Sequence, residues 1–395
     1  MDDSTALPSP VGETSVAFDL ARLARSLRLA LTLRGLVISV FGALLPSAIA
    51  TFGLTDAEVS VLPVATGLAA TLGPMTVGWL TQRQGPRLGM ILTAAALLLS
   101  ACLLWAAPLW AAFVTGAFAM SWGASGMATA ISVILAEAYR SRSGAAFNSS
   151  FLFVGVGSLI SPLLAAAVLA LGYPWRATFA LLALAFTVLL WLASSLPYDV
   201  IARPHEAHRG ETEGKPWWQQ RVIVLCALAL VCYVGAEVGL TTWIARYLVA
   251  HRGVDLAVAT MSPSVFWAGM IVGRWAFSRG LIARNEKQMV TWAGWGGVAS
   301  VIGIVALPGG VWPWLSLLVA GATFGGLWPT IMSYAAVRSS GHTGAASGLL
   351  IALGFLGALI VPALIGLSSS WIGLGASLLL VPLMIALTFV LFLAA

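Results

Sequence analysis

Charged residues are scarce in this chain. Of its 395 residues only 9% are Asp, Glu, Lys or Arg, whereas 60% are hydrophobic. A soluble protein of this length could not cover its surface with so few charges, so the composition excludes a soluble globular protein. Backbone amides in hydrocarbon must be satisfied within a helix or a closed barrel, and the apolar runs here have helix length. The sequence therefore predicts an all-α integral membrane protein.

Residue patterns that support enzymatic chemistry are also missing. The sequence has no HExxH motif, no paired membrane aspartates and no phosphate-cradling loop. All three cysteines fall in predicted helices, which gives no indication of disulfides. The histidines lie only in predicted loops or at helix ends: His205, His208, His251 and His342. We therefore predict that the chain is not an enzyme and has neither a cofactor nor a metal site.

Apolar runs long enough to cross a bilayer are, by contrast, abundant. A crossing needs about 20 apolar residues. Twelve segments meet this length, at 29–52, 59–80, 87–107, 109–136, 145–170, 175–196, 221–249, 258–283, 288–307, 312–337, 343–368 and 371–393. Because the number is even, both termini are expected on the same side of the membrane.

Lysines and arginines lie mainly on one side of these spans. Such residues are retained in cytoplasmic loops. With the termini inside, the inner clusters are Arg22, Arg25, Arg28, Arg83, Arg87, Arg140, Arg142, Arg203, Arg209, Lys215, Arg221, Arg279, Arg284, Lys287 and Arg338, against Arg176, Arg252 and Arg246 outside. This distribution predicts a multi-pass protein of the cytoplasmic (inner) membrane with both termini cytoplasmic. It also accounts for the net charge of +6, so we predict no nucleic-acid partner.

A polar stretch from Pro197 to Arg221 divides the chain into two halves that repeat at an offset of 200 positions. Residues 143–162 align with 343–362 without a gap. The shift matches Gly144, Ala145, Ala146, Gly157 and Pro162 with Gly344, Ala345, Ala346, Gly357 and Pro362, and Pro63, Gly73 and Gly126 with Pro263, Gly273 and Gly326. Parallel six-helix repeats of this kind are typical of transporters that bind a solute near the midplane. The predicted organisation is a leader at 1–27, either an interfacial amphipathic helix or a flexible basic segment, a bundle at 28–196, a cytoplasmic linker at 197–220 and a bundle at 221–395.

With twelve spans, a basic central loop and this duplication, the chain resembles the major facilitator superfamily along nearly its whole length. Its segment "GWLTQRQGPRLG" (78–89) is similar to the inner gating motif of that superfamily. Gly78, Arg83, Gly85 and Arg87 match the motif, whereas Gln82 stands where the motif has aspartate. The resemblance implies two pseudo-symmetric six-helix bundles with a gate at this loop, whose charge pairing is weakened or replaced by hydrogen bonds.

The segment "CYVGAEVGLTTW" (232–243) resembles the fucose-permease-type sugar symporters of the superfamily. The matching residues are Tyr233, Val234, Gly235, Glu237 and Trp243. The acidic residues that this branch carries in helices 1 and 4 are absent here. The resemblance implies a sugar as a candidate solute, with proton coupling dependent on Glu237.

Glu237 stands near the middle of an apolar span. An ionised carboxylate there costs at least about 2.5 kcal/mol, so the side chain is expected to face the bundle interior. Tyr233 and Thr241 lie four residues to either side and share its helix face. Desolvation favours the protonated form of such a carboxyl, as a proton carrier requires. We predict that Glu237 couples transport to protons or binds a polar group of the solute, the alternative being an ion pair that only locks two helices together.

Further interior residues are candidates for solute contacts or gating. Tyr233, Thr241, Trp122, Ser132, Asn148, Trp267 and Trp328 are predicted to line a central cavity, where aromatic faces suit a sugar ring or an aromatic solute. Arg274 lies roughly 10 Å closer to the cytoplasm than Glu237, by about 1.5 Å of rise per residue, and a role in gating or packing is as favoured for it as one in substrate binding. Glu137 is predicted to pair with Arg140 at the inner end. Arg34 is either a residue that snorkels to the headgroups or, if it points inward, a contact for an anionic solute.

We therefore predict a secondary transporter that alternates access to a midplane site and moves a small polar solute, with a sugar as one candidate and a proton as the coupling ion. Efflux of amphipathic compounds is the alternative. A sensor without transport activity and a membrane enzyme are less favoured. The predicted partners are the solute, the proton and the lipid bilayer, and the chain is predicted to act as a monomer.

Overall fold

The computed structural model describes residues 10–139, 143–198, 220–280, 285–338 and 343–395. Every regular element in these ranges is a helix. The helices are α1 (Pro10–Phe52), α2 (Asp56–Val59), α3 (Val61–Gln84), α4 (Pro86–Ala106), α5 (Trp110–Tyr139), α6 (Ser143–Ala170), α7 (Ala177–Ser195), α8 (Arg221–Arg252), α9 (Leu256–Thr260), α10 (Ser262–Ser278), α11 (Glu286–Ala306), α12 (Trp312–Phe324), α13 (Leu327–Arg338), α14 (Thr343–Ile372), α15 (Leu374–Ser377) and α16 (Leu380–Ala394). They form twelve segments long and apolar enough to cross a membrane. The predicted all-α fold with twelve spans is confirmed.

Four of these spans consist of two helices with a break between them. The pairs are α2 with α3, α9 with α10, α12 with α13 and α15 with α16. Two of the breaks follow equivalent caps. Thr55 and Glu58 form a capping box at the start of α2, and the Asp255 carboxylate accepts hydrogen bonds from the Ala257 and Val258 amides at the start of α9. The twofold repeat therefore extends to the short helices, which hydropathy alone does not separate from the spans that follow them.

Close helix crossings repeat in the two halves. A Cβ atom on Gly157 of α6 would overlap the carbonyl of Thr32 and the backbone of Gly35 in α1. A Cβ atom on Gly357 of α14 would overlap the carbonyl of Val231 and the amide of Gly235 in α8. Small residues allow helix backbones to approach this closely inside a membrane. The matched glycines at 157 and 357 therefore make the same contact in each half, and Gly35 with Gly235 adds a pair to the predicted repeat.

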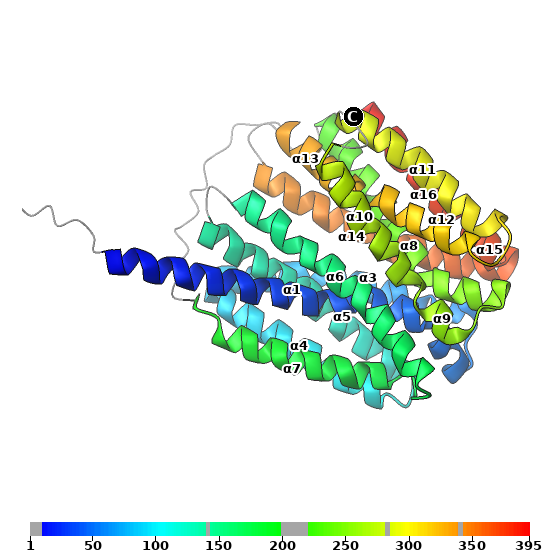
Figure 1. Cartoon of the computed structure of the whole chain (residues 1–395), viewed down its shortest axis with the longest axis horizontal. Coiled ribbons are helices and arrows are strands. Elements are labelled where there is room, and N and C mark those ends of the chain that lie inside the picture. The colour runs from blue at the N-terminus through cyan, green and yellow to red at the C-terminus, as the bar shows by residue number, and fades with distance from the viewer. Residues whose placement is uncertain (1–9, 140–142, 199–219, 281–284, 339–342) are drawn as a thin grey trace, which may run out of the picture.

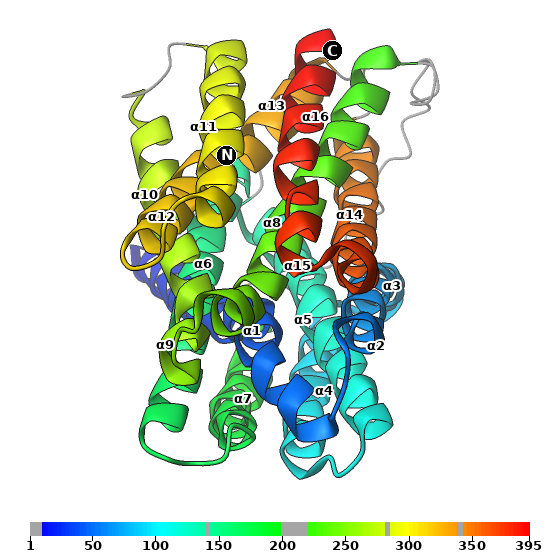
Figure 2. The same ribbon diagram turned by 90° about the vertical axis from the view of Figure 1, so that its right-hand side faces the viewer.

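The two halves lie side by side with α1, α8 and α14 near their junction. In Figure 1 α4, α5 and α7 of the first half lie in the lower part of the molecule and α11, α12, α13 and α16 of the second half in the upper part, whereas α9 lies at the height of the first half. Figure 2 views the molecule from the end that carries α2, α9 and α15. We call the end that carries α2, α9 and α15 the far end, because the two termini lie toward the opposite end. Contacts between the halves join α1 to α8, α3 to α14, α6 to α9 and α6 to α10. The central helices are thus covered on most sides by protein.

The first helix begins earlier than the hydropathy pattern predicts. α1 runs without a break from Pro10, well before the predicted start of the first span at 29. Leu23 and Leu27 are fully buried, whereas Arg22 and Arg25 are exposed. The arginines therefore occupy one face of a helix whose other face packs, and the predicted leader is helical from Pro10 and continuous with the first span. The boundary between them at 27 stays a prediction. The predicted linker at 197–220 lies almost entirely outside the described residues.

Candidate substrate site

Glu237 lies at the middle of α8 and is half-buried. This helix contacts α1 of the first half and, in its own half, α9, α10, α13, α14, α15 and α16. Between Val222 and Val249, Leu228 is the only exposed residue of α8. Because the surroundings of α8 are protein, the accessible part of Glu237 faces the interior of the bundle and not acyl chains.

Tyr233 and Arg274 stand next to this carboxyl group. The Tyr233 hydroxyl and the Arg274 guanidinium both interact electrostatically with Glu237. The described residues contain one ion pair, and it joins two other residues, so Glu237 is not neutralised by a salt bridge to Arg274. The Tyr233 hydroxyl is buried, and none of its contacts with described residues has the geometry of a hydrogen bond. The carboxyl therefore sits beside a cation and a donor without being locked to either of them.

Arg274 reaches the membrane midplane through a break in the neighbouring span. Its Nε donates a hydrogen bond of 3.2 Å to the carbonyl oxygen of Gly325. Gly325 lies between α12 and α13, at the middle of the span Trp312–Arg338. The arginine side chain is therefore long enough to span the predicted difference in depth between the backbones at Arg274 and Glu237. The carbonyl oxygen of Gly325 is free to accept this bond because the helix is interrupted at Gly325 and Gly326.

Arg34 points into the first half and not toward the headgroups. The side chain is 8% exposed, and its Nε donates a hydrogen bond of 2.7 Å to the carbonyl oxygen of Ala124. Ala124 lies at the middle of α5 (Trp110–Tyr139). The inward orientation, which was the condition for a role in solute binding, is therefore met.

Aromatic rings border the group around Glu237. Tyr233 lies 6.2 Å from Phe324 and 6.4 Å from Trp328 between ring centroids, and Trp328 is half-buried. Trp267 lies seven residues before Arg274, on the same face of α10. It is 4% exposed, and its indole Nε1 has no hydrogen-bond partner among the described residues. The Trp267 indole is thus a buried donor without an acceptor among the described residues, whereas the Tyr233 hydroxyl has the Glu237 carboxyl beside it. Buried polar groups such as this indole usually have partners.

Other predicted cavity residues lie apart from this group or make local bonds. Trp122 donates a hydrogen bond of 2.9 Å to the hydroxyl of Thr76 in α3. The hydroxyls of Thr241 and Ser132 each donate to a carbonyl one turn earlier in their own helices. The side chain of Asn148 lies outside the described residues. For these four residues a contact with solute stays a prediction.

The predicted inner gate lies between α3 and α4. Gly85 has a φ of 83° at the junction and so permits the tight turn. Gln82 is exposed and has no recorded hydrogen bond with a described residue. Arg83 stacks on Trp79 at 4.4 Å, Arg87 lies 5.8 Å from the Tyr198 ring, and a Cβ on Gly78 would have only an ordinary contact. Glu137 is half-buried with an unpaired Oε2, and its predicted partner Arg140 lies outside the described residues.

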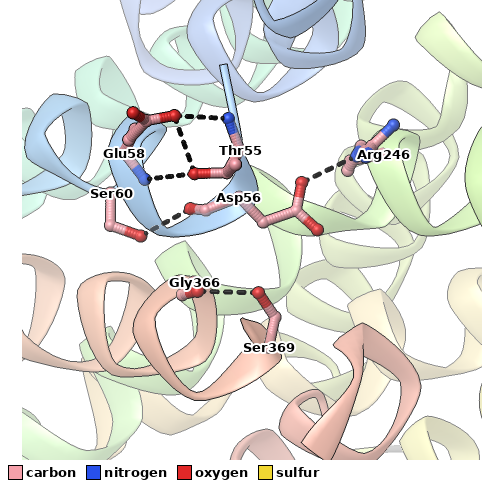
Figure 3. A network of polar contacts seen from close by, with 7 residues as sticks. All are labelled: Thr55, Asp56, Glu58, Ser60, Arg246, Gly366 and Ser369. Atoms are coloured by element: carbon pink, nitrogen blue, oxygen red, sulfur yellow. Dashed lines mark hydrogen bonds and ion pairs between the residues drawn. The ribbon is translucent and has the colours of Figure 1, made fainter. Parts of the chain in front are cut away.

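An ion pair joins the two halves at the far end, and nothing in the sequence indicated it. Figure 3 shows Arg246 of α8 and Asp56 of α2, whose Nε and Oδ1 atoms are 2.9 Å apart. Next to this pair, the hydroxyl of Ser60 lies where a Cβ atom on Gly366 of α14 would be. An ion pair and a close-packed contact therefore join α2 and the start of α3 to the second half.

Comparisons with known proteins agree with this arrangement. A family model described as the Major Facilitator Superfamily matches residues 27–362. A glucose/galactose transporter from Brucella abortus is 30% identical over 207 residues, which are 52% of this chain and 50% of that protein. A Protein TsgA homolog from Erwinia tasmaniensis is 30% identical over 145 residues, which are 37% of this chain and 36% of that protein. The matches thus span half or less of the length of these relatives.

Solved structures share the fold over almost the whole chain. A D-xylose-proton symporter has a TM-score of 0.75 at 15% identity, covering 95% of this chain and 97% of that one. The E. coli fucose:proton symporter has a TM-score of 0.63 at 18% identity, covering 94% and 98%. At these identities the similarity establishes the fold and nothing about the solute.

Proposed function

The chain belongs to the major facilitator superfamily, and on this basis we propose that it moves a small polar solute across the cytoplasmic membrane by alternating access to a site around Glu237. The superfamily match and the twelve spans make it a multi-pass membrane transporter. A sugar is the leading candidate for the solute. The partial match to a glucose/galactose transporter and the unpaired indole donor of Trp267, which suits an oxygen atom of a sugar, support this choice.

Glu237 is the residue proposed to carry the coupling proton. The observation that supports this role is its position: a half-buried carboxyl at the middle of α8, facing the bundle interior, without an ion pair among the described residues. A carboxyl sealed in a salt bridge would hold its charge throughout a transport cycle. One that is only near a cation can gain and lose a proton as the site changes its exposure to water.

The cycle proposed for these residues has two states of Glu237. When the site is open to the side with more protons, Glu237 binds a proton, and the neutral side chain lowers the cost of closing the site to water. Arg274 and Tyr233 then orient toward the solute. When the halves rock and the site opens to the other side, the nearby guanidinium favours release of the proton. Solute and proton therefore leave on the same side.

The test is uptake into proteoliposomes with an imposed proton gradient. Wild type is expected to accumulate the solute, whereas Glu237→Gln, which mimics the protonated state, is expected to lose accumulation and to retain exchange across equal concentrations. The matched control is Glu286→Gln, because Glu286 is exposed at the start of α11. Accumulation by Glu237→Gln with the same proton dependence as wild type would refute the coupling role.

Efflux of amphipathic compounds is the alternative function. Its supporting observation is the set of aromatic rings beside the charged group, namely Tyr233, Phe324 and Trp328. Proton-driven extrusion of a lipophilic cation in the same vesicles, together with no sugar uptake, would favour it. The inner-membrane location, the cytoplasmic termini and the monomeric state stay predictions in either case.

A further inference from the structure

Arginines outnumber acidic residues among the charged side chains at the middle of the spans. Arg34 and Arg274 reach carbonyl oxygens at mid-depth in α5 and between α12 and α13. Among the described residues, Glu237 is the single acidic residue at this depth. A guanidinium remains protonated throughout the physiological pH range. The three side chains together therefore carry one net positive charge when Glu237 is ionised and two when it is protonated.

The two arginines differ in what surrounds them. Arg274 interacts with Glu237 and Tyr233. Arg34 is more than nine-tenths buried and forms no ion pair with a described residue. Its recorded bond is to the Ala124 carbonyl, which accepts one N–H but does not neutralise the charge. A buried cation without a counter-ion is costly in a membrane, so Arg34 is the position where an anion is missing.

The unpaired polar group beside Glu237 is likewise a donor. The indole of Trp267 can only donate, and it is buried without a hydrogen-bond partner among the described residues. A ligand that completes such a site must supply acceptors. The hydroxyls of a neutral sugar both donate and accept, whereas a carboxylate only accepts.

We propose that the transported solute is a small organic anion, such as a sugar acid, whose carboxylate binds Arg34. This inference rests on the proposed transport function and names the chemical class of the solute. The bond from Nε to Ala124 holds the plane of the guanidinium, and the two Nη groups present the paired donors that a carboxylate accepts. α1, which carries Arg34, contacts α8, which carries Glu237, so protonation of Glu237 removes a negative charge from the same central region and favours binding of the anion. The coupling proton then offsets the charge of the solute during transport.

The experiment compares matched pairs of probes by titration calorimetry on the purified full chain at fixed ionic strength. D-galacturonate is paired with D-galactose and D-gluconate with sorbitol, because the members of each pair differ in the carboxylate. We expect saturable binding of at least one carboxylate and no binding of its neutral partner. Arg34→Gln is expected to weaken binding about thirtyfold or more, and Arg34→Lys is expected to weaken it less. Arg25→Gln is the control, because Arg25 lies on the same helix and donates to the Ala21 carbonyl but is exposed.

Several results would overturn the proposal. They are binding of the neutral partner as tight as that of the carboxylate, no binding of either carboxylate to wild type, unchanged binding in Arg34→Gln, and equal competition by chloride or sulfate. If Arg34→Gln does not elute as a monodisperse protein, the affinity of Arg34→Lys for the carboxylate is measured instead. An affinity equal to that of wild type would count against the proposal. Proton-driven uptake of D-galactose would refute the proposal that the solute is an anion and would support the proposed transport function. Arg34-dependent binding of D-galacturonate without uptake would support the anion site and refute the proposed transport function.

Discussion

The ion pair between Asp56 and Arg246 is expected to hold the far end of the two halves together. The side chains are 17% and 26% exposed, and one N–O contact of 2.9 Å joins them. Exposed pairs of this kind contribute about 0.2–1 kcal/mol. Partial burial favours the upper part of that range, and about 1 kcal/mol changes the ratio of two states about fivefold. Asp56→Asn and Arg246→Gln should each increase the population that is open at the far end by about this factor.

The population can be measured through Ser60, which is 3% exposed and lies against Gly366 of the other half. Ser60→Cys, placed in a background without Cys102, Cys226 and Cys232, reports opening through its rate of reaction with a membrane-impermeant maleimide. Each single substitution should raise the rate about fivefold. The double substitution should raise it no further, because the two side chains form one interaction.

The control for this measurement is Asp255→Asn, since asparagine retains the cap of α9 and the substitution removes a carboxylate at the same end. It should leave the labelling rate unchanged. Exchanging the two charges, with Asp56→Arg and Arg246→Asp together, should restore the slow rate. Additive effects of the two single substitutions, or labelling that does not respond to any of them, would show that the pair does not hold the halves together.

Most of the fold could be predicted because hydropathy and repetition are local or periodic signals. The spans have the predicted order, and most of their ends agree within a few residues. The sequence did not show that the leader and the first span form one helix, because arginines on one face end an apolar run without ending a helix whose other face is buried at Leu23 and Leu27. The break between α12 and α13 was missed because two glycines inside an apolar span do not lower its hydropathy.

The site was predictable only where its residues share a helix. Tyr233 and Glu237 follow from helical spacing, and Trp267 with Arg274 lie on one face for the same reason. Whether Arg34 points to headgroups or to the interior depends on the packing of α1 against α5, about which a single sequence carries no signal. Asp56 and Arg246 are 190 positions apart, so no spacing rule connects them. The sequence thus indicates which charges are unusual, and tertiary packing decides which of them meet.

Two further substitutions test the packing and the charged group separately. Gly157→Ala should lower the midpoint of thermal unfolding, because the new methyl group would overlap the backbone of α1 at a cost of about 1–3 kcal/mol or more, whereas Gly309→Ala, with no atom within 4 Å, should not. Arg274→Lys retains the charge, but the lysine has no planar fork with which to bind the Gly325 carbonyl while remaining beside Glu237. We therefore expect slower transport at every pH with the proton dependence retained, since Glu237 itself is unchanged. Uptake assays from pH 5 to 8 would measure both quantities. Wild-type rates in Arg274→Lys would mean that a positive charge alone is sufficient and that the guanidinium geometry has no role.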